Sequence, residues 1–153
     1  LCALGLAEID AMGNVNVSKF HDRVTGPGGF IDLAQHTKKL ILMGTFTAGG
    51  LREHCEGGRL VIDREGKYQK FKTDIEQVTF SGDYAAAHGQ HVLVVTERAV
   101  FRLTPQGLML TEIAPGVDLE RDILSQMEFR PLIADDLQLM DGRIFQPDPM
   151  GLS

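Results

Sequence analysis

The residues best suited to chemistry are three glycines within four positions, Gly26-Pro27-Gly28-Gly29. Glycine lets a backbone turn sharply and approach a ligand more closely than any residue with a Cβ allows. Residues 30–36 are predicted to open a helix, and the first N–H groups of a helix have no partner within it. A glycine turn before a helix therefore presents N–H donors to an anionic group. We expect this loop to form part of an active site.

A second glycine pair, Gly49-Gly50, follows a strand predicted over residues 39–46. In open α/β sheets, ligands bind outside the carboxyl ends of the strands, so this position is a candidate site. A Gly-Gly pair is more often only a turn, and the first loop is the stronger candidate.

Glu97 also follows a predicted buried strand, Val92-Leu93-Val94-Val95. A carboxylate at this edge of a sheet can accept hydrogen bonds that orient its neighbours in a site. Alternatively, Glu97 and Arg98 form an ordinary surface ion pair of little energetic consequence. The pattern favours neither interpretation.

Asn16 lies in Val15-Asn16-Val17-Ser18, where alternation places Asn16 and Ser18 on one face of a short strand. Its amide could brace the nearby turn, or it could reach into the cleft beside the glycines. Spacing alone favours the bracing role.

The remaining pattern predicts an α/β fold. Strands are expected over residues 3–9 and 39–46 and at 92–95, and a hairpin over 99–103 and 108–113. Residues 51–80 alternate in short runs and predict an antiparallel meander with a solvated, charged face. Asp118 is a good N-cap for a helix with Leu119, Ile123, Leu124 and Met127 on one face. From Pro131 onward we expect an irregular tail that packs against another domain or subunit.

Length and composition indicate one domain over residues 1–153. The 15 Lys and Arg against 21 Asp and Glu give a net charge of -6, which argues against nucleic-acid binding. Two isolated cysteines, Cys2 and Cys55, favour a reduced cytoplasm. His88 and His91 form the closest histidine pair, and no metal site is expected because no nearby ligand completes the set. The chain starts inside a predicted strand, so we expect it to be cut from something longer.

Several known motifs are absent from the sequence. It contains neither a G-x-S-x-G elbow nor a G-x-x-x-x-G-K-[ST] loop. The first glycine loop also lacks the further glycine that the dinucleotide fingerprint needs. By pattern alone the sequence contains a glycine loop that could bind a ligand, but no motif that identifies a nucleophile.

In combination, the segments nevertheless resemble the C-terminal half of the family I CoA-transferases of the acetate/propionate and 3-ketoacid type. The resemblance runs in order through nearly the whole chain and is weakest over residues 51–84. It rests on Leu4-Gly5-Leu6-Ala7-Glu8-Ile9-Asp10, Gly13-Asn14-Val15-Asn16-Val17-Ser18-Lys19-Phe20, Gly26-Pro27-Gly28-Gly29-Phe30-Ile31-Asp32, Gly44-Thr45-Phe46-Thr47-Ala48-Gly49-Gly50, Thr96-Glu97-Arg98-Ala99-Val100-Phe101 and Gly107-Leu108 through Glu112-Ile113-Ala114-Pro115-Gly116.

The resemblance implies an open, mainly parallel sheet flanked by helices, with the antiparallel excursion inserted at about 51–80. It implies transfer of CoA between an acyl-CoA and a short-chain carboxylic acid through a glutamyl-CoA thioester. Coenzyme A is then a substrate, and no separate cofactor is expected. Gly28 or Gly29 would donate an N–H to the oxyanion, and Glu97 would orient its neighbours. Contacts with the substrate or CoA are expected from Asn16, Gly26, Phe30, Gly49 and Gly50.

The sequence departs from the family in one respect, because nothing in it reproduces the glycine-flanked motif of the nucleophilic glutamate. Glu8, Glu97 and Glu112 match family positions that have other roles. We therefore expect an N-terminal half or partner subunit to carry the nucleophile, this chain alone to be inactive, and the enzyme to form homo-oligomers. The alternatives are an acyl-CoA hydrolase of the same fold and a non-catalytic domain that binds CoA or a partner.

Overall fold

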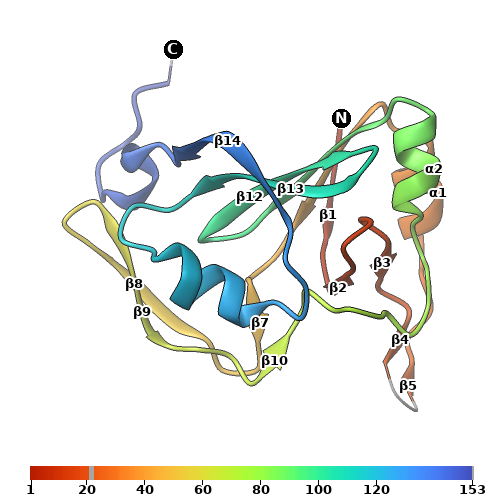
Figure 1. The fold of residues 1–153 in the computed structure, drawn as a ribbon, viewed down its shortest axis with the longest axis horizontal. Helices are drawn as coiled ribbons and strands as arrows, with labels where there is room; N and C mark the ends of the chain where they lie inside the picture. The colour runs from red at the N-terminus through yellow and green to blue at the C-terminus, as the bar shows by residue number, and fades with distance from the viewer. Residues whose placement is uncertain (21–22, 153) are drawn as a thin grey trace.

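The computed structural model describes residues 1–20 and 23–152, and its central element is a mixed sheet (Figure 1). Within these residues the sheet has six strands, in the order β1-β6-β11-β12-β13-β14. The pairs β1–β6, β6–β11 and β13–β14 are parallel, whereas β12 is antiparallel to both neighbours. The strands are β1 (Cys2–Gly5), β6 (Lys39–Met43), β11 (His91–Val95), β12 (Ala99–Thr104), β13 (Gly107–Ile113) and β14 (Leu132–Leu139).

Short antiparallel ladders extend from the sheet. They are β2 (Glu8–Ile9) with β3 (Val15–Asn16), β4 (Lys19–Phe20) with β5 (Arg23–Val24), β7 (Thr47–Ala48) with β10 (Tyr68–Gln69), and β8 (Arg52–Glu56) with β9 (Arg59–Arg64). The helical segments are α1 (Phe30–His36), α2 (Gly82–Ala87), the π-helical turn η1 (Leu119–Ile123) and the 3₁₀ turns η2 (Leu124–Gln126) and η3 (Gly142–Phe145). None of the helices in the described ranges is long and apolar enough to cross a bilayer.

The hydrophobic core lies on the sheet face that α1 and α2 cover. A row of aligned residues crosses the strands on this face, and all of them are fully buried: Leu42, Val94, Phe101 and Leu110. Phe30 and Ala34 of α1 and Ala85 of α2 belong to the same cluster. Because side chains alternate along a strand, the intervening residues point to the opposite face.

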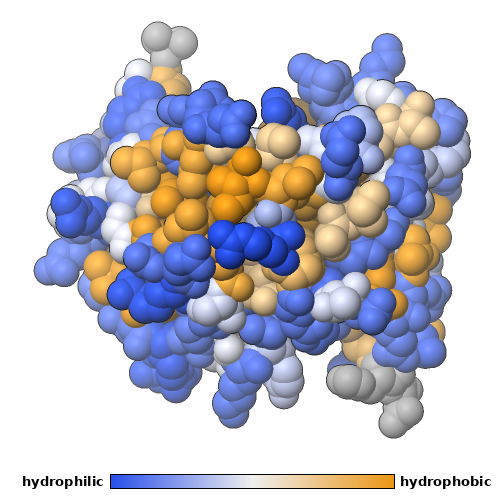
Figure 2. Space-filling model, viewed as in Figure 1, coloured by the Kyte–Doolittle hydropathy of each residue, from blue (hydrophilic) through white to orange (hydrophobic). Residues whose placement is uncertain are grey.

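That opposite face is apolar but partly open. The aligned row there runs through Ile41, Leu93, Arg102, Met109 and Leu132. Leu93 and Leu132 keep 37% and 39% of their surface exposed. Figure 2 shows hydrophobic side chains gathered over the β12–β14 part of the view.

The predicted secondary structure is confirmed for the helix over residues 30–36, the buried strands and the hairpin of β12 and β13. Asp118 caps the predicted helix by accepting a hydrogen bond from the N–H of Arg121. The helix is a π turn followed by a 3₁₀ turn, with Ile123 and Met127 buried as expected.

Three predictions about elements are wrong. The strand expected over residues 3–9 breaks after Gly5, where the chain leaves β1 and turns to pair with β3. The meander is a two-stranded hairpin, because β10 pairs with β7 instead of β9 and residues 76–80 contribute only an isolated bridge. The tail after Pro131 forms β14, which completes the sheet beside β13. A register shift between Leu110 and Glu112 interrupts that ladder.

Candidate active site

The carboxyl ends of β1, β6 and β11 lie side by side, and each continues into a segment that carries candidate residues. The N–H of Leu6 bonds to the carbonyl of Met43 at 2.7 Å, and that of Gly44 to the carbonyl of Val95 at 3.2 Å. These bonds continue the parallel ladders past the strands. The edge at which α/β sheets bind ligands is thus formed by the segments that follow the three strands.

Glu97, directly after β11, is held by hydrogen bonds to both carboxylate oxygens. Its Oε2 accepts from the N–H of Phe46 at 2.8 Å, and its Oε1 accepts from Nε of Arg98 at 2.7 Å. The Arg98 side chain is fully buried. The pair is therefore not an exposed surface pair, and Glu97 joins the loop after β6 to the end of β11.

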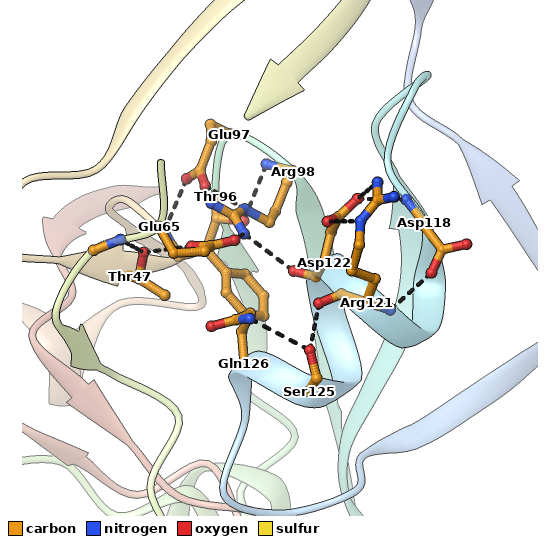
Figure 3. A network of polar contacts seen from close by, with 12 residues as sticks. Thr47, Glu65, Thr96, Glu97, Arg98, Asp118, Arg121, Asp122, Ser125 and Gln126 are labelled. Carbon is orange, nitrogen blue, oxygen red and sulfur yellow. Dashed lines mark hydrogen bonds and ion pairs between the residues drawn. The ribbon is translucent and has the colours of Figure 1, made fainter. Parts of the chain in front are cut away.

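Arg98 is the centre of this network (Figure 3), although the sequence indicated it only as a possible surface partner of Glu97. Its Nη1 donates to Glu65 Oε1 at 2.5 Å and to the carbonyl of Asp122 at 3.1 Å. Its guanidinium carbon lies 5.1 Å from the ring centroid of Phe46. Burial works against the charge of Arg98, but hydrogen bonds and charges from Glu65 and Glu97 outweigh it and raise the Arg98 pKa.

Thr47 ties the β8–β9 excursion to the loop after β6. Its hydroxyl donates to Glu65 Oε2 at 2.9 Å and accepts from the N–H of Gly66 at 2.9 Å. A Cβ on Gly66 would lie 2.4 Å from the carbonyl oxygen of Ala48, so only glycine fits here. Glu65 thus connects Thr47 and Arg98, and the charges of the excursion are not merely a solvated face.

Glu53 is a further carboxylate near this network. Burial raises its pKa, and the charges of Glu97 and Glu65 add to the rise, whereas Arg98 opposes it. Its Oε2 is buried and has no hydrogen-bond partner among the described residues. The same is true of Nη2 of Arg98.

A cavity of about 870 Å³ lies beside the ends of β1 and β6. Lys70 lines it, is only 7% exposed, and donates from Nζ to the carbonyl of Thr45 at 2.8 Å. Burial lowers the pKa of Lys70, and the charge of Glu97 acts in the opposite direction. The residues lining the cavity are Leu6, Ala7, Glu8, Phe20, Ala48, Gly66, Lys67, Tyr68, Gln69, Lys70, Lys72 and Gln126.

The segment of residues 67–72 had been interpreted as an exposed strand because its lysines alternate with other residues. That interpretation is wrong for Lys70, whose backbone carbonyl accepts from the N–H of Ile9 at 2.9 Å. This bond draws the segment against the turn after β1. Its neighbour Phe71 is fully buried. This aromatic residue was the one feature of the sequence that could have indicated that the segment packs against the core.

The first glycine loop lies at the surface next to the β4–β5 ladder. Gly26 and Gly28 have positive φ values of 74° and 53°, and Gly29 caps α1 with φ -85°. A Cβ at any of these glycines would meet nothing within 4 Å. Phe30 is buried below the loop. The loop is open to solvent, and none of the three glycines is among the residues that line the 870 Å³ cavity.

Asn16 is fully buried, and its amide is occupied by neighbours. Its Nδ2 donates to Glu8 Oε2 at 2.8 Å and to the carbonyl of Lys19 at 2.6 Å. Its Oδ1 accepts from the N–H groups of Ser18 and Lys19. This geometry matches the bracing interpretation, and Asn16 meets the cavity through its partner Glu8.

Gly49 and Gly50 form a turn that packs against the excursion. A Cβ on Gly49 would lie 2.6 Å from the Tyr68 ring, and one on Gly50 would lie 2.9 Å from Nη2 of Arg64. The carbonyl of Gly50 accepts from Arg64 Nε at 2.9 Å and Nη2 at 2.7 Å. The pair accordingly has clear structural roles in the turn.

The described ranges contain no candidate metal site. Within residues 1–20 and 23–152, no three His, Cys, Asp or Glu side chains are grouped so that they could hold a metal ion. Cys2 and Cys55 are free thiols.

Proteins of known function are similar in sequence to nearly the whole chain, although no protein-family model matches it. The chain is 48% identical over 151 residues to acetate CoA-transferase YdiF of Escherichia coli K12, covering 99% of this chain and 28% of that enzyme. It is 48% identical to the caffeate CoA-transferase of Acetobacterium woodii, over 99% of this chain and 30% of that protein. The acetate CoA-transferase subunit beta of Haemophilus influenzae is 34% identical over 91% of this chain and 52% of its own length.

The fold agrees with these relationships. The YdiF crystal structure described as a thioester complex with CoA superposes with a TM-score of 0.97 at 48% identity, over 99% of this chain and 30% of that chain. The chain spans less than a third of the length of the full-length relatives that it matches. By sequence and by fold, the chain belongs to the family I CoA-transferases, as a segment homologous to part of those enzymes.

Proposed function

We propose that this chain forms part of the active site of an enzyme that transfers CoA between an acyl-CoA and a short-chain carboxylic acid. The observation that carries the proposal is the 48% identity to YdiF over 99% of the chain. The matched region includes the glycine loop and the strand ends where Glu97 and Arg98 are fixed.

The proposed reaction runs through covalent glutamyl intermediates. A glutamate carboxylate attacks the acyl carbonyl, the C–S bond breaks, and an acyl-glutamyl anhydride and CoA thiolate result. The thiolate then attacks the glutamyl carbonyl, which releases the first acid and forms a glutamyl-CoA thioester. The second acid attacks this thioester to give a new anhydride, and the returning thiolate releases the new acyl-CoA and the free glutamate.

This chain would contribute oxyanion stabilisation. Each tetrahedral species carries a negative oxygen, and the N–H of Gly28 or Gly29 is proposed as a donor to it. The open space around both glycines leaves room for a substrate to approach the backbone. Gly26, Gly49 and Gly50 are proposed to contact the substrate or CoA, and the buried Phe30 and Asn16 to support these contacts from below.

The nucleophile is proposed to lie outside residues 1–153. Both oxygens of Glu97 already accept hydrogen bonds, so this carboxylate is suited to orienting Phe46 and Arg98 rather than to attack. One oxygen of Glu8 is likewise occupied by Asn16. The proposal therefore includes a partner segment or subunit that carries the glutamate, in a cytoplasmic, homo-oligomeric enzyme, and it implies that this chain alone does not turn over.

The test is to locate the covalent adduct. The complete enzyme is incubated with acetyl-CoA, digested and examined by mass spectrometry, and a CoA adduct is expected on a glutamate outside residues 1–153. The Glu97→Gln variant should still form the adduct, more slowly. An adduct on Glu97 itself would contradict the assigned roles.

Acceptor dependence separates transfer from hydrolysis. A transferase consumes acetyl-CoA faster when a second carboxylic acid is added, whereas a hydrolase of the same fold consumes it at a rate that the acid does not raise. A non-catalytic domain would form no adduct and consume no thioester.

A further inference from the structure

Lys70 has unused hydrogen-bonding capacity at the wall of the 870 Å³ cavity. A lysine ammonium offers three N–H donors, and Thr45 accepts from Nζ of Lys70 at 2.8 Å. No other hydrogen bond of this ammonium is found within the described residues. Since the residue is 7% exposed and lines the cavity, a further partner for its ammonium, whether water or a ligand, reaches it through the cavity.

Two of the neighbouring charged groups of the cavity already have partners, and a third, Lys67, is exposed to solvent. Lys72 is paired with Glu128, and Glu8 accepts from Nδ2 of Asn16 at 2.8 Å. Lys70 is held at its backbone and at its side-chain end. Its carbonyl accepts a hydrogen bond from the N–H of Ile9, and its Nζ packs so closely against Gly44 that a Cβ there would lie 2.7 Å from it. Among the lysines that line the cavity, Lys70 is therefore the buried one with donors to spare.

Part of the remaining wall is apolar. Leu6, Ala7, Phe20 and Tyr68 line the cavity, together with polar side chains such as that of Gln69. Pockets of a few hundred to about 1,000 Å³ take organic ligands considerably larger than two carbons. An anion with an apolar tail of several carbons matches a buried cation that lies beside the apolar part of this wall.

We propose that this cavity binds the carboxylic acid substrate, with its carboxylate on Nζ of Lys70 and its tail against Leu6, Phe20 and Tyr68. The inference rests on the proposed function and extends it to a substrate class, monocarboxylic acids with a tail longer than that of acetate. Lys70 then distinguishes an acid from a neutral molecule of the same shape.

The test uses hexanoate as the acid and hexan-1-ol as its uncharged counterpart. Binding of each to the full chain is followed by NMR titration of the residues that line the cavity. Hexanoate is expected to bind more tightly than hexan-1-ol. Lys70→Gln removes the charge and leaves a neutral N–H donor on a side chain that is one bond shorter, and it should weaken hexanoate binding by about tenfold or more, because charge-assisted hydrogen bonds are the strong ones.

Two further variants control this result. Lys39→Gln removes the same charge at an exposed position at the start of β6, far along the strand from the cavity edge, and should leave hexanoate binding unchanged. In Gly44→Ala the new Cβ would lie 2.7 Å from Nζ of Lys70, so the variant displaces the ammonium while keeping its charge, and hexanoate binding should also weaken. Hexan-1-ol binding should respond little to Lys70→Gln.

Three results would overturn the inference: hexanoate fails to bind, Lys70→Gln binds it as well as the unmodified chain, or hexan-1-ol binds equally tightly. Failure of the proposed function would look different. The complete enzyme would then form no glutamyl-CoA adduct although hexanoate still binds at Lys70.

Discussion

At the scale of residues, Arg98 shows how one buried cation organises a site. It lies between Glu97 and Glu65, and the Phe46 ring covers its guanidinium. Removing one member of a buried ion pair leaves the opposite charges unpaired, which costs more than the pair itself contributes.

Replacement of Arg98 by methionine is therefore expected to lower the free energy of unfolding by about 3 kcal/mol at neutral pH. Urea denaturation measures the change. Arg52→Met, at an exposed position on β8, is the matched control and should change stability by less than about 0.5 kcal/mol. A loss below about 1 kcal/mol for Arg98→Met, as for a surface pair, would contradict the central role of Arg98.

Glu53 provides a pH-dependent prediction at the same scale. Burial and the nearby Glu97 raise its pKa in the folded chain, so folding favours the protonated carboxyl. Its stabilising contribution is complete below the ordinary pKa that the group has in the unfolded chain, and it is lost as the pH rises through the higher pKa of the folded chain. Glu53→Gln should thus be more stable than the unmodified chain at pH 7, and the difference should shrink toward pH 4.

Urea unfolding at several pH values measures this effect. Glu56→Gln, at an exposed position on the same strand, reports the simple removal of one negative charge. A stabilisation by Glu53→Gln that is equal at all pH values would show that Glu53 does not carry the shifted pKa.

At the scale of elements, the turn before α1 determines what the glycine loop can do. Gly29 has φ -85°, which is close to the angle that proline imposes, and proline has no N–H. The variants Gly29→Pro and Gly29→Ala thus separate the loss of the donor from the addition of a side chain, because a Cβ at this position meets nothing within 4 Å.

In the complete enzyme, Gly29→Pro is expected to lower kcat by about 100-fold with a smaller change in KM, since the oxyanion exists only after attack. Gly29→Ala keeps the N–H and should stay close to the unmodified rate. Steady-state kinetics with acetyl-CoA and a carboxylic acid measure both. If Gly29→Pro and a bulky substitution at Gly28 both leave kcat unchanged, the oxyanion role is wrong.

At the scale of the whole molecule, an aromatic cluster joins segments that are distant in sequence. The Phe71 ring lies 4.5 Å from that of Phe46 and 5.0 Å from that of Phe101, and 6.4 Å from Phe129. These rings come from the segment after β10, the loop after β6, β12 and the segment after η2. Phe71 thus fixes the position of the neighbouring Lys70 relative to the sheet.

Phe71→Ala is accordingly expected to cost about 3–5 kcal/mol of unfolding free energy, through lost burial and the cavity left behind. Phe71→Leu should cost less because it fills more of the space. Urea denaturation gives the values, with Tyr68→Ala as an exposed aromatic control on the same segment. A small cost for Phe71→Ala would mean that the segment is not anchored by its ring.

The sequence alone determined the local elements. Apolar runs predicted β6 and β11, a turn signal predicted the hairpin of β12 and β13, and Asp118 marked a helix start, because these features depend on residues close along the chain. The apolar run before Glu97 placed this residue at a strand end, and the family resemblance gave it an orienting role. Local pattern could not reveal that β10 pairs with β7 or that residues 132–139 complete the sheet, since strand pairing depends on partners elsewhere in the chain.

Only the tertiary structure decided which charges are buried together. Arg98 meets Glu65 from 33 positions away, and Lys70 meets the carbonyl of Thr45 from 25 positions away. In the sequence all of these side chains look like solvated charges. Packing of the excursion against the sheet removes water from them, and a charge without water must find a partner, which is why the site could be read only from the folded chain.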